Sequence, residues 1–512
     1  MSRVSKSLKN AKVGLFFYAI AIFVAFFSRK IFLEYLGADF VGLISVLQSI
    51  LGFLNIAELG IGTAIGYALY KPIFDGDQKE INQLIQYFGS LYKKIGLIIL
   101  VLSLLVSVFF PFFFSDVPFS LPLIYFAFFT FVLSSLLGYF LNYHQTLFQA
   151  DQKEYIISQY FQTAGILKSI LQIVLIYFYS NYYLWIVIEL VFAFVIALIL
   201  RWRVKKSYPW LKITLGSEAR HIKYPEILVK IKQIVVHKIS FFVLMGTDQI
   251  LIYSFVNLSS VAFFSNYQLI FGYVQTFVNN GFGGTQASIG NLIAENNFKN
   301  TKKVFWEMMA IRHFFGGFLF IAFYFLTGFF IKIWIGEQFI LSEEVLLLMC
   351  ANIYISQIRA PVSDFINGYG LFSDTWAPIT EALLNLGISI VLGMYLGIAG
   401  ILLGTFISTF LIVVLWKPYY LYTRGFRTII WEYWKGFGKL FISFLLTFVF
   451  IEFLRQNIFD SVPSDYFRWA LYAVKICVCS AVVYVTILYF LNQGFRDFSK
   501  RLKNIIIKRL KR

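Results

Sequence analysis

Charged side chains are scarce in this chain, and their scarcity limits what the protein can be. Only 14% of the 512 residues are Asp, Glu, Lys or Arg, whereas 59% are hydrophobic and the mean hydropathy is +0.75. This composition is too apolar for a soluble globular domain, whose surface must be largely polar. We therefore predict an integral membrane protein.

Residues that carry catalysis or bind metals are also few. The chain has four widely spaced histidines and three cysteines, Cys350, Cys477 and Cys479, all within apolar runs. These numbers allow neither a disulfide framework nor a compact metal site. No phosphate-binding glycine loop, Cys-x-x-Cys pair or histidine-acid motif is present. We predict a protein that is not an enzyme, with no catalytic residue, metal or cofactor.

Long apolar runs fill most of the sequence. About 20 apolar residues are needed to cross a hydrocarbon layer roughly 30 Å thick. Short polar connections separate 14 such runs, and none is long enough for a large outer domain. We predict an all-α, polytopic membrane protein with about 14 transmembrane helices. The predicted spans lie near 13–36, 42–70, 92–115, 121–149, 155–179, 183–202, 234–257, 260–290, 305–334, 343–368, 376–396, 398–422, 437–454 and 467–491.

Lys and Arg are distributed unevenly between the two sets of connections. Of the 44 basic residues, 36 lie on the tails or on connections facing the same side as the N-terminus. Because cytoplasmic connections are enriched in Lys and Arg, both termini are predicted to be cytoplasmic. The net charge of +18 is then mainly a topology signal, and no nucleic acid is expected as a partner. The basic amphipathic tail 495–512 is predicted to lie on anionic lipids of the inner leaflet.

Two segments of the chain resemble each other. VGLISVLQSILGF at 41–53 and VAFFSNYQLIFGY at 261–273 share five identities in 13 positions, and the similarity resumes after a shift of four residues. Six predicted spans separate the copies, so the two halves have the same orientation in the membrane. We predict two six-helix lobes, 1–230 and 231–423. Two additional helices and the basic tail follow at 424–512.

Four stretches carry a family resemblance: LEYLGADFVGLISVLQSILGFLNIAELGIGTAIGYALYKP, TDQILIYSFVNLSSVAFFSNYQLI, TQASIGNLIAEN and INGYGLFSDTWAPITEALLNLGISIVLGMYLGIAGILLGTFIST. They resemble the O-antigen and capsule flippases of the multidrug/oligosaccharidyl-lipid/polysaccharide export superfamily. The resemblance implies a MATE-like fold in a bacterial inner membrane. It also implies transport of undecaprenyl-diphosphate-linked oligosaccharides to the outer leaflet, with glycan polymerase machinery as a further partner. One departure is the neutral stretch 375–377, where relatives often carry Lys or Arg.

Several cations lie within predicted spans, and a charge at the bilayer centre costs about 2.5–3.5 kcal/mol on insertion scales. Such a residue usually faces a cavity or a charged partner. Because a planar guanidinium can hold two phosphate oxygens, we predict that Arg29, Lys30 and Arg359 contact the diphosphate from opposite lobes. Alternatively, Arg29 and Lys30 extend to the outer interface. Arg312 is placed near an inner helix end.

Lys168 and the acids within the spans each leave two interpretations open. Lys168 either faces the cavity or pairs with an acid such as Glu189 or Asp248. Glu58 and Asp248 are predicted to be cavity or ion-coupling carboxylates, with H⁺ or Na⁺ as the ion. The alternative for each is a structural pair with a buried cation.

The glycine-rich segment NNGFGGTQASIGN also leaves two interpretations open. Its amides offer hydrogen bonds to sugars, and the predicted contacts are Asn279, Asn280, Gln286 and Asn291. The alternative is close helix packing through its small residues.

The predicted function is a flippase that works by alternating access between the lobes. One alternative is a MATE-type cation-coupled drug exporter, which needs an acidic cavity. The other is a flippase for lipid II, the peptidoglycan precursor. An inside-negative potential favours outward movement of an anion by about 2.3 kcal/mol per charge and 100 mV, so a coupling ion is permitted but not required.

Overall fold

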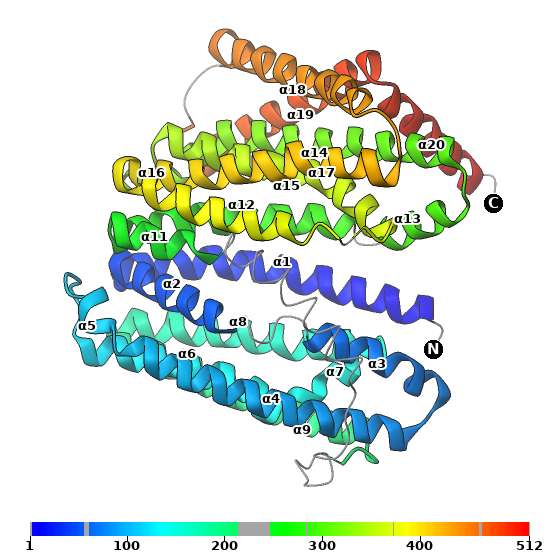
Figure 1. The fold of residues 1–512 in the computed structure, drawn as a ribbon. Coiled ribbons are helices and arrows are strands. Elements are labelled where there is room, and N and C mark those ends of the chain that lie inside the picture. Colours follow the sequence, from blue (N-terminus) through cyan, green and yellow to red (C-terminus); the bar gives the residue numbers. More distant parts are fainter. Residues whose placement is uncertain are drawn as a thin grey trace. The chain divides into compact units, whose positions relative to one another are not determined.

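The computed structural model describes residues 3–55, 61–212, 246–282, 285–371, 373–459 and 463–510, and every regular element in these ranges is a helix (Figure 1). The chain divides into two compact units, Met1–Ala262 and Phe263–Arg512. The division falls inside α12 (Leu258–Gly281). The lobe boundaries expected at 230 and 423 stay predictions.

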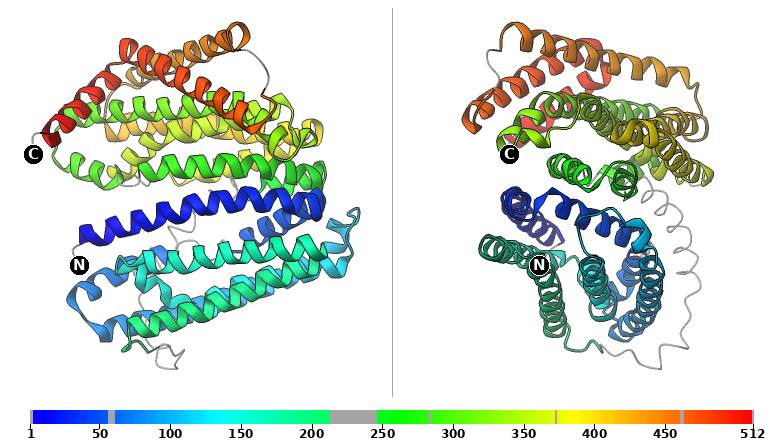
Figure 2. Two further views of the ribbon diagram at one scale, coloured as in Figure 1. Left: turned by 180° about the vertical axis from the view of Figure 1, so that it is seen from behind. Right: turned by 90° about the vertical axis from the view of Figure 1, so that its left-hand side faces the viewer.

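The first unit consists of membrane-length helices joined by short ones. In this unit α1 packs on α8, α8 on α9, α9 on α6 and α6 on α4 (Figure 2). Helix α2 contacts α6 and α11. The helices are α1 (Arg3–Tyr35), α2 (Gly37–Leu54), α3 (Ile61–Asp75), α4 (Gln78–Ser107), α5 (Phe110–Phe113), α6 (Leu121–Leu141), α7 (Thr146–Ala150), α8 (Glu154–Tyr179), α9 (Tyr182–Ser207) and α11 (Asp248–Phe255), with a 3₁₀ turn, η2 (Tyr143–Gln145).

The second unit is organised around one long helix, α14, which packs on α15, α18, α19 and α20. Its elements after α12 are α13 (Thr285–Ala294), α14 (Phe298–Trp334), the 3₁₀ turn η4 (Glu337–Phe339), α15 (Glu343–Gly368), α16 (Trp376–Thr409), the π-helical η5 (Phe410–Trp416), α17 (Lys417–Tyr420), the π-helical η6 (Leu421–Gly425), α18 (Trp431–Asn457), α19 (Tyr466–Leu491) and α20 (Gln493–Leu510).

A sharp bend at Gly397 separates two predicted spans that form one continuous run of helix, Trp376–Gly425. Gly397 has a φ of 56°, a left-handed conformation that costs glycine little because it has no Cβ. The two arms then pack closely, since a Cβ at Gly404 would meet atoms of Ser389. Asn385 Nδ2 donates to Thr405 Oγ1 at 2.9 Å between the arms. The bend therefore folds this run back on itself.

Eleven helices among the described residues are long and apolar enough to cross a membrane. The difference from 14 has three sources. Most of the predicted span 234–257 lies outside the described residues, and the bent run counts once. In the predicted span 260–290, α12 is long enough but not apolar enough to be counted, and α13 is too short. The protein is a multi-pass, all-α membrane protein, and the number 14 stays a prediction.

The internal similarity corresponds to a repeated arrangement of helices. In the first copy, α2 ends at Leu54 and the short α3 precedes the long α4; in the second, α12 ends at Gly281 and the short α13 precedes the long α14. Both long helices begin at a capping side chain. Asp77 accepts a hydrogen bond from the backbone N–H of Glu80 at 2.9 Å, and Asn297 accepts one from that of Asn300 at 3.1 Å. The glycine-rich segment is thus the place where the second copy interrupts its helix.

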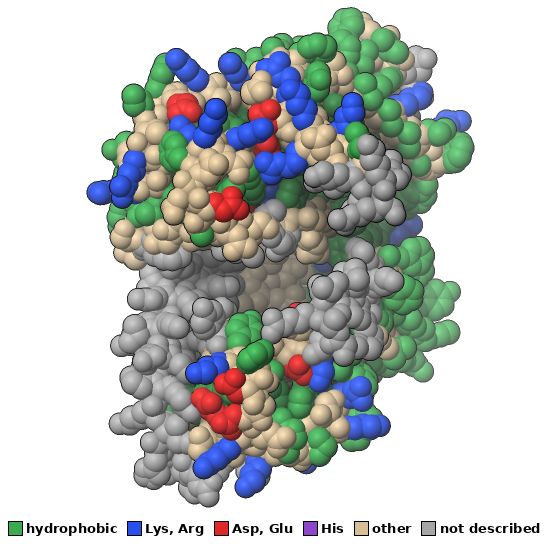
Figure 3. Space-filling view, turned by 90° about the vertical axis from the view of Figure 1, so that its right-hand side faces the viewer, with side chains coloured by type: hydrophobic (Ala, Val, Ile, Leu, Met, Phe, Trp, Pro, Cys, Tyr) green, Lys and Arg blue, Asp and Glu red, His purple; other side chains and the backbone are tan. Residues whose placement is uncertain are grey.

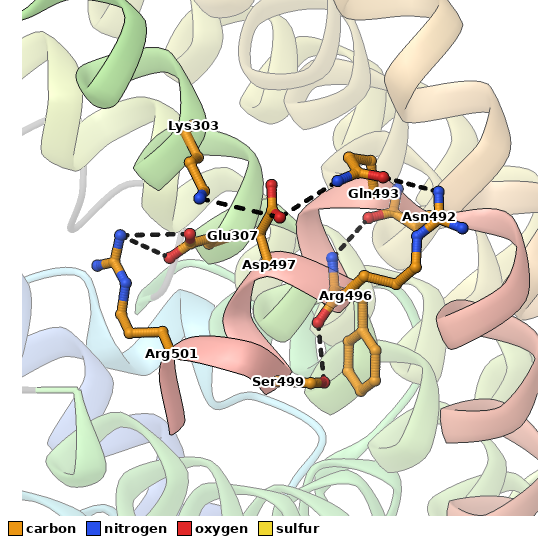
Figure 4. A network of polar contacts seen from close by, with 9 residues as sticks. Lys303, Glu307, Asn492, Gln493, Arg496, Asp497, Ser499 and Arg501 are labelled. Carbon is orange, nitrogen blue, oxygen red and sulfur yellow. Dashed lines mark hydrogen bonds and ion pairs between the residues drawn. The ribbon is translucent and has the colours of Figure 1, made fainter. Parts of the chain in front are cut away.

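The C-terminal helix α20 is attached to α14 by a polar network (Figure 4). Arg501 Nη2 lies 3.0 Å from Oε2 of Glu307, whose side chain is 3% exposed, and Lys303 Nζ lies 3.9 Å from Asp497 Oδ1. Gly494 allows this contact, because a Cβ there would meet the carbonyl oxygen of Trp306. The amphipathic tail is therefore fixed to the second unit.

Lys and Arg side chains gather on the end of the helices where α13 and α20 lie (Figure 3). The lysines of α20 at 500 and 503 are exposed there. This clustering agrees with the asymmetry in the sequence. That this end faces the cytoplasm stays a prediction.

Two adjacent glycines let neighbouring helices approach α14 on different sides. A Cβ at Gly316 would lie 3.1 Å from Tyr354 Cδ2 and 3.2 Å from Gln357 Cβ of α15. A Cβ at Gly317 would lie 2.6 Å from Tyr484 of α19 and 2.8 Å from Phe444 of α18. These glycines set the distance at which α15 and the helix pair α18–α19 pack, as small residues do in membrane helices.

We expect Gly317→Ala to lower the thermal unfolding midpoint of the purified protein, because overpacking costs about 1–3 kcal/mol. Gly328→Ala is the matched control on the same helix, since a Cβ there meets nothing within 4 Å. Alanine is the better helix former, so the control variant should be at least as stable as the wild type. Equal midpoints for both variants, measured by intrinsic fluorescence, would contradict the packing described for Gly317.

Candidate transport sites

Lys168 and Glu189 form an ion pair inside the first unit. Lys168 Nζ of α8 lies 2.8 Å from Glu189 Oε2 of α9. Gln172, one turn after Lys168, donates from Nε2 to Glu189 Oε1 at 2.9 Å and to the backbone carbonyl of Trp185 at 3.2 Å. Both carboxylate oxygens are therefore engaged. This is the pairing that the sequence left open for Lys168, and its cavity role stays a prediction.

A polar cavity of about 200 Å³ lies between helices of the first unit. Asn55 Oδ1, at the end of α2, accepts hydrogen bonds from Ser135 Oγ and Tyr139 OH of α6, each at 3.2 Å. Two buried oxygens that line it, Asn142 Oδ1 and Gln145 Oε1, have no hydrogen-bond partner in the described part of the chain. Such acceptors in a polar cavity are suited to water or to a small donor or cation.

Of the two acids predicted to face a cavity, only Asp248 can be placed. It is buried at the start of α11, and its Oδ1 has no hydrogen-bond partner among the described residues. Glu58 lies outside the described residues. The ion-coupling role of either residue stays a prediction.

The cations predicted to contact the diphosphate lie in separate units. On α1 of the first unit, Arg29 is half-buried and Lys30 is exposed. Arg359 of α15, in the second unit, is half-buried and acts electrostatically on Glu381 of α16. Their meeting at one ligand stays a prediction.

A polar cluster in the second unit surrounds Arg312 of α14. Its Nη1 donates to Gln357 Oε1 at 2.8 Å and to Asn279 Oδ1 at 3.0 Å, while Gln357 Nε2 donates to Asn279 Oδ1 at 3.4 Å. The guanidinium carbon lies 3.8 Å from the centre of the Phe282 ring. A cation over an aromatic face is stabilised by the ring quadrupole. We call these four residues the Arg312 cluster.

Among the described residues, the groups in direct contact with this guanidinium are neutral. Arg312 is 6% exposed, forms no ion pair with a carboxylate of the described chain, and has an Nε without a hydrogen-bond partner there. Asp364 acts on it electrostatically. Gly316 lies four residues after Arg312, on the same helix face, and brings α15 close enough for Gln357 to reach it. The cluster therefore holds a positive charge that no carboxylate of the described residues contacts directly.

The predicted sugar-binding amides are divided by the structure. Asn279 belongs to the Arg312 cluster at its exposed edge, and Asn280 and Asn291 are exposed on α12 and α13. The side chain of Gln286 lies outside the described part of the chain. Gln357 and Phe282 were not among the predicted site residues, and Arg312 had no predicted role. An arginine among the apolar residues of a span is the signal that could have identified Arg312.

Acidic, histidine and cysteine side chains form no group of three that is suited to a metal ion within the described ranges. The Arg312 cluster and the cavity at Asn55 are two polar sites with unused hydrogen-bonding capacity in the described part of the chain.

The fold is that of a class of membrane transporters. No family model and no curated protein matches the chain. An inward-facing multidrug-resistance MATE transporter of the MOP superfamily superimposes with a TM-score of 0.62 at 13% identity, over 78% of this chain and 93% of that one. The lipid II flippase MurJ, in an inward closed conformation, superimposes with a TM-score of 0.59 at 16% identity, over 94% and 98%. A MATE structure in a bent conformation gives 0.51 at 13%, over 81% and 94%. The predicted MATE-like fold is confirmed.

The Lys168–Glu189 pair can be tested by single and double replacement. We expect Lys168→Met alone, or Glu189→Met alone, to lower the thermal midpoint, because each leaves a charge without its partner in an apolar surrounding. The double variant should recover most of the loss. A double variant no more stable than either single variant would contradict the pairing.

The same double variant separates the two roles of Lys168 once transport is measured. Transport that survives in a stable double variant indicates a structural pair. Loss of transport with normal membrane levels indicates that Lys168 also faces the substrate path.

Proposed function

We propose that this protein is a flippase that moves polyprenyl-diphosphate-linked oligosaccharides, of the undecaprenyl type, from the inner to the outer leaflet of a bacterial inner membrane. Movement would occur by alternating access between the two lobes. The proposal rests on the MATE-like fold, on the family resemblance of the sequence and on the charge of the Arg312 cluster.

The Arg312 cluster is the observation that carries the proposal. A diphosphate needs a fixed cation with several donors, and an Arg guanidinium supplies them in a planar array. Here the guanidinium is oriented by two amides and an aromatic ring, and no ion pair with a described carboxylate consumes its charge. A cationic drug would be repelled by such a group, which argues against the drug-exporter alternative.

The extent of the structural match favours a lipid-linked substrate. MurJ superimposes on 94% of this chain and the MATE transporter on 78%. The number of additional residues that MurJ covers is close to the length of the segment Trp431–Leu510. That segment contains α18, α19 and α20, which pack on α14, the helix that carries Arg312. Lipid II itself stays an alternative substrate, and anionic lipids are proposed partners of the exposed lysines of α20.

Transport in proteoliposomes tests the proposal. We expect the purified protein to expose a labelled undecaprenyl-diphosphate oligosaccharide to an enzyme added outside, faster than empty liposomes do. Lipid II and a fluorescent cationic drug are measured in parallel. A preference for lipid II would make lipid II the substrate, and movement of the drug alone would contradict a flippase. Collapsing the potential and the proton gradient separately identifies the driving force.

Arg312→Gln should reduce this transport at least roughly tenfold, because one charge-assisted contact to a phosphate is worth about 1.5–3 kcal/mol. Arg312→Lys should retain part of the activity, since it keeps the charge and loses the planar fork. Arg468→Gln is the matched control, because this side chain is 67% exposed at the start of α19. Wild-type transport by a correctly folded Arg312→Gln protein would contradict the assigned role.

A further inference from the structure

The second unit has a hollow of about 690 Å³ lined by four aromatic and several polar side chains. It lies where α15 is connected to α16 and where the bent run Trp376–Gly425 ends. Under the predicted topology these helix ends face the cytoplasm. The volume is within the range of about 300–1,000 Å³ that is usual for pockets that bind small ligands.

Four aromatic rings form one wall of the hollow. The Trp376 and Trp416 rings lie 4.7 Å apart, and Trp416 stacks on Tyr420 with 6.1 Å between ring centroids and 17° between planes. Tyr419 lies 5.5 Å from Trp416 and is 46% exposed, as is Trp376. Flat, accessible ring faces of this kind accept the C–H face of a sugar ring, because the face of an aromatic ring is electronegative.

Polar groups at the edges match the hydroxyls of a sugar. Asp374 is 4% exposed and pairs through Oδ2 with Lys417 Nζ at 2.6 Å, so its Oδ1 can accept from a hydroxyl. The hydroxyls of Ser373 and Tyr420 share a hydrogen bond of 2.7 Å, and Arg424 also lines the hollow. Charged groups that are held in place by partners fix the orientation of a bound ligand and also add to its affinity.

One donor in this wall is unused. Nε1 of Trp416 is buried and has no acceptor within the described part of the chain. A tryptophan of the interfacial belt instead keeps its N–H at the polar headgroups.

The local helix geometry explains why these side chains share one wall. Pro418 has no N–H for the helical ladder, and π-helical turns lie on both sides of it, η5 ending at Trp416 and η6 beginning at Leu421. Trp416, Tyr419 and Tyr420 then follow one another on a single helical face that lines the hollow. Pro418 alone accounts for the π-helical turns. It does not account for the aromatic side chains that these turns bring to the hollow.

We infer that this hollow binds sugar residues of the glycan that the protein transports, before the lipid-linked substrate crosses the membrane. The inference rests on the proposed function. The hollow is separate from the Arg312 cluster, so it recognises the sugar and the cluster recognises the diphosphate.

The test is direct binding of the protein in lipid nanodiscs to an array of immobilised oligosaccharides, followed by calorimetry with the best ligand in solution. We expect Trp376→Ala to weaken binding roughly tenfold, the loss of one stacking contact. Asp374→Asn should weaken it similarly. Trp431→Ala is the matched control, because this tryptophan is 62% exposed at the start of α18 and does not line the hollow.

Three results would overturn the inference: no oligosaccharide bound by the wild type, equal losses in Trp376→Ala and Trp431→Ala, or binding that disappears when phosphatidylglycerol replaces phosphatidylcholine in the nanodisc. The last result would make the hollow a site for lipid headgroups. Transport measured on the same samples separates the two proposals. Sugar binding at the hollow without any flipping would refute the flippase and keep the site, whereas flipping by a Trp376→Ala protein with unchanged sugar binding would refute the site alone.

Discussion

The hydrocarbon layer offers no water, so each polar group within it must find its partner inside the protein. The first unit meets this constraint with the Lys168–Glu189 pair, in which Gln172 engages the second carboxylate oxygen. The second unit meets it with Asn385 and Thr405 between the arms of the bent run. These contacts connect neighbouring helices and fix their rotation. Because both oxygens of Glu189 are engaged, the pair in the first unit has little capacity left for a ligand.

Functional capacity is expected where the constraint is met incompletely. Arg312 is oriented by amides and a ring without a direct carboxylate, and Trp416 Nε1 has no described acceptor. Asp248 has a buried oxygen without a described partner. Each leaves hydrogen-bonding or charge capacity that the described residues do not use. A transporter needs such groups, since its substrate must bind and leave.

Much of the fold is predictable from the sequence, because hydrophobic length is a strong signal. The bend at Gly397 lies between the predicted spans 376–396 and 398–422, and the internal repeat identified the helices that precede each interruption. Helices α4 and α14 begin before the predicted spans 92–115 and 305–334. Their first turns are polar and begin at the caps Asp77 and Asn297. Hydropathy does not detect a helix that extends beyond the membrane.

The sites are less predictable, because they depend on contacts between distant residues. Asn279 was selected for its amide, yet its neighbours Arg312 and Gln357 are 33 and 78 residues away along the chain. The pairing of Lys168 was one of two alternatives, and only the packing of α8 on α9 distinguishes Glu189 from Asp248 as its partner. Likewise, no sequence pattern joins Asp374 with Trp416 and Tyr420, since the bend that brings both helix ends together lies between them.

The central claim is that this protein binds a polyprenyl-diphosphate-linked glycan. Native mass spectrometry of the protein, purified in a mild detergent from cells that synthesise such lipids, tests it most directly. The account predicts a bound species whose fragments give a polyprenyl diphosphate and sugar residues, and whose occupancy falls in the Arg312→Gln protein. Only ordinary phospholipids, with the same occupancy in wild type and variant, would contradict it.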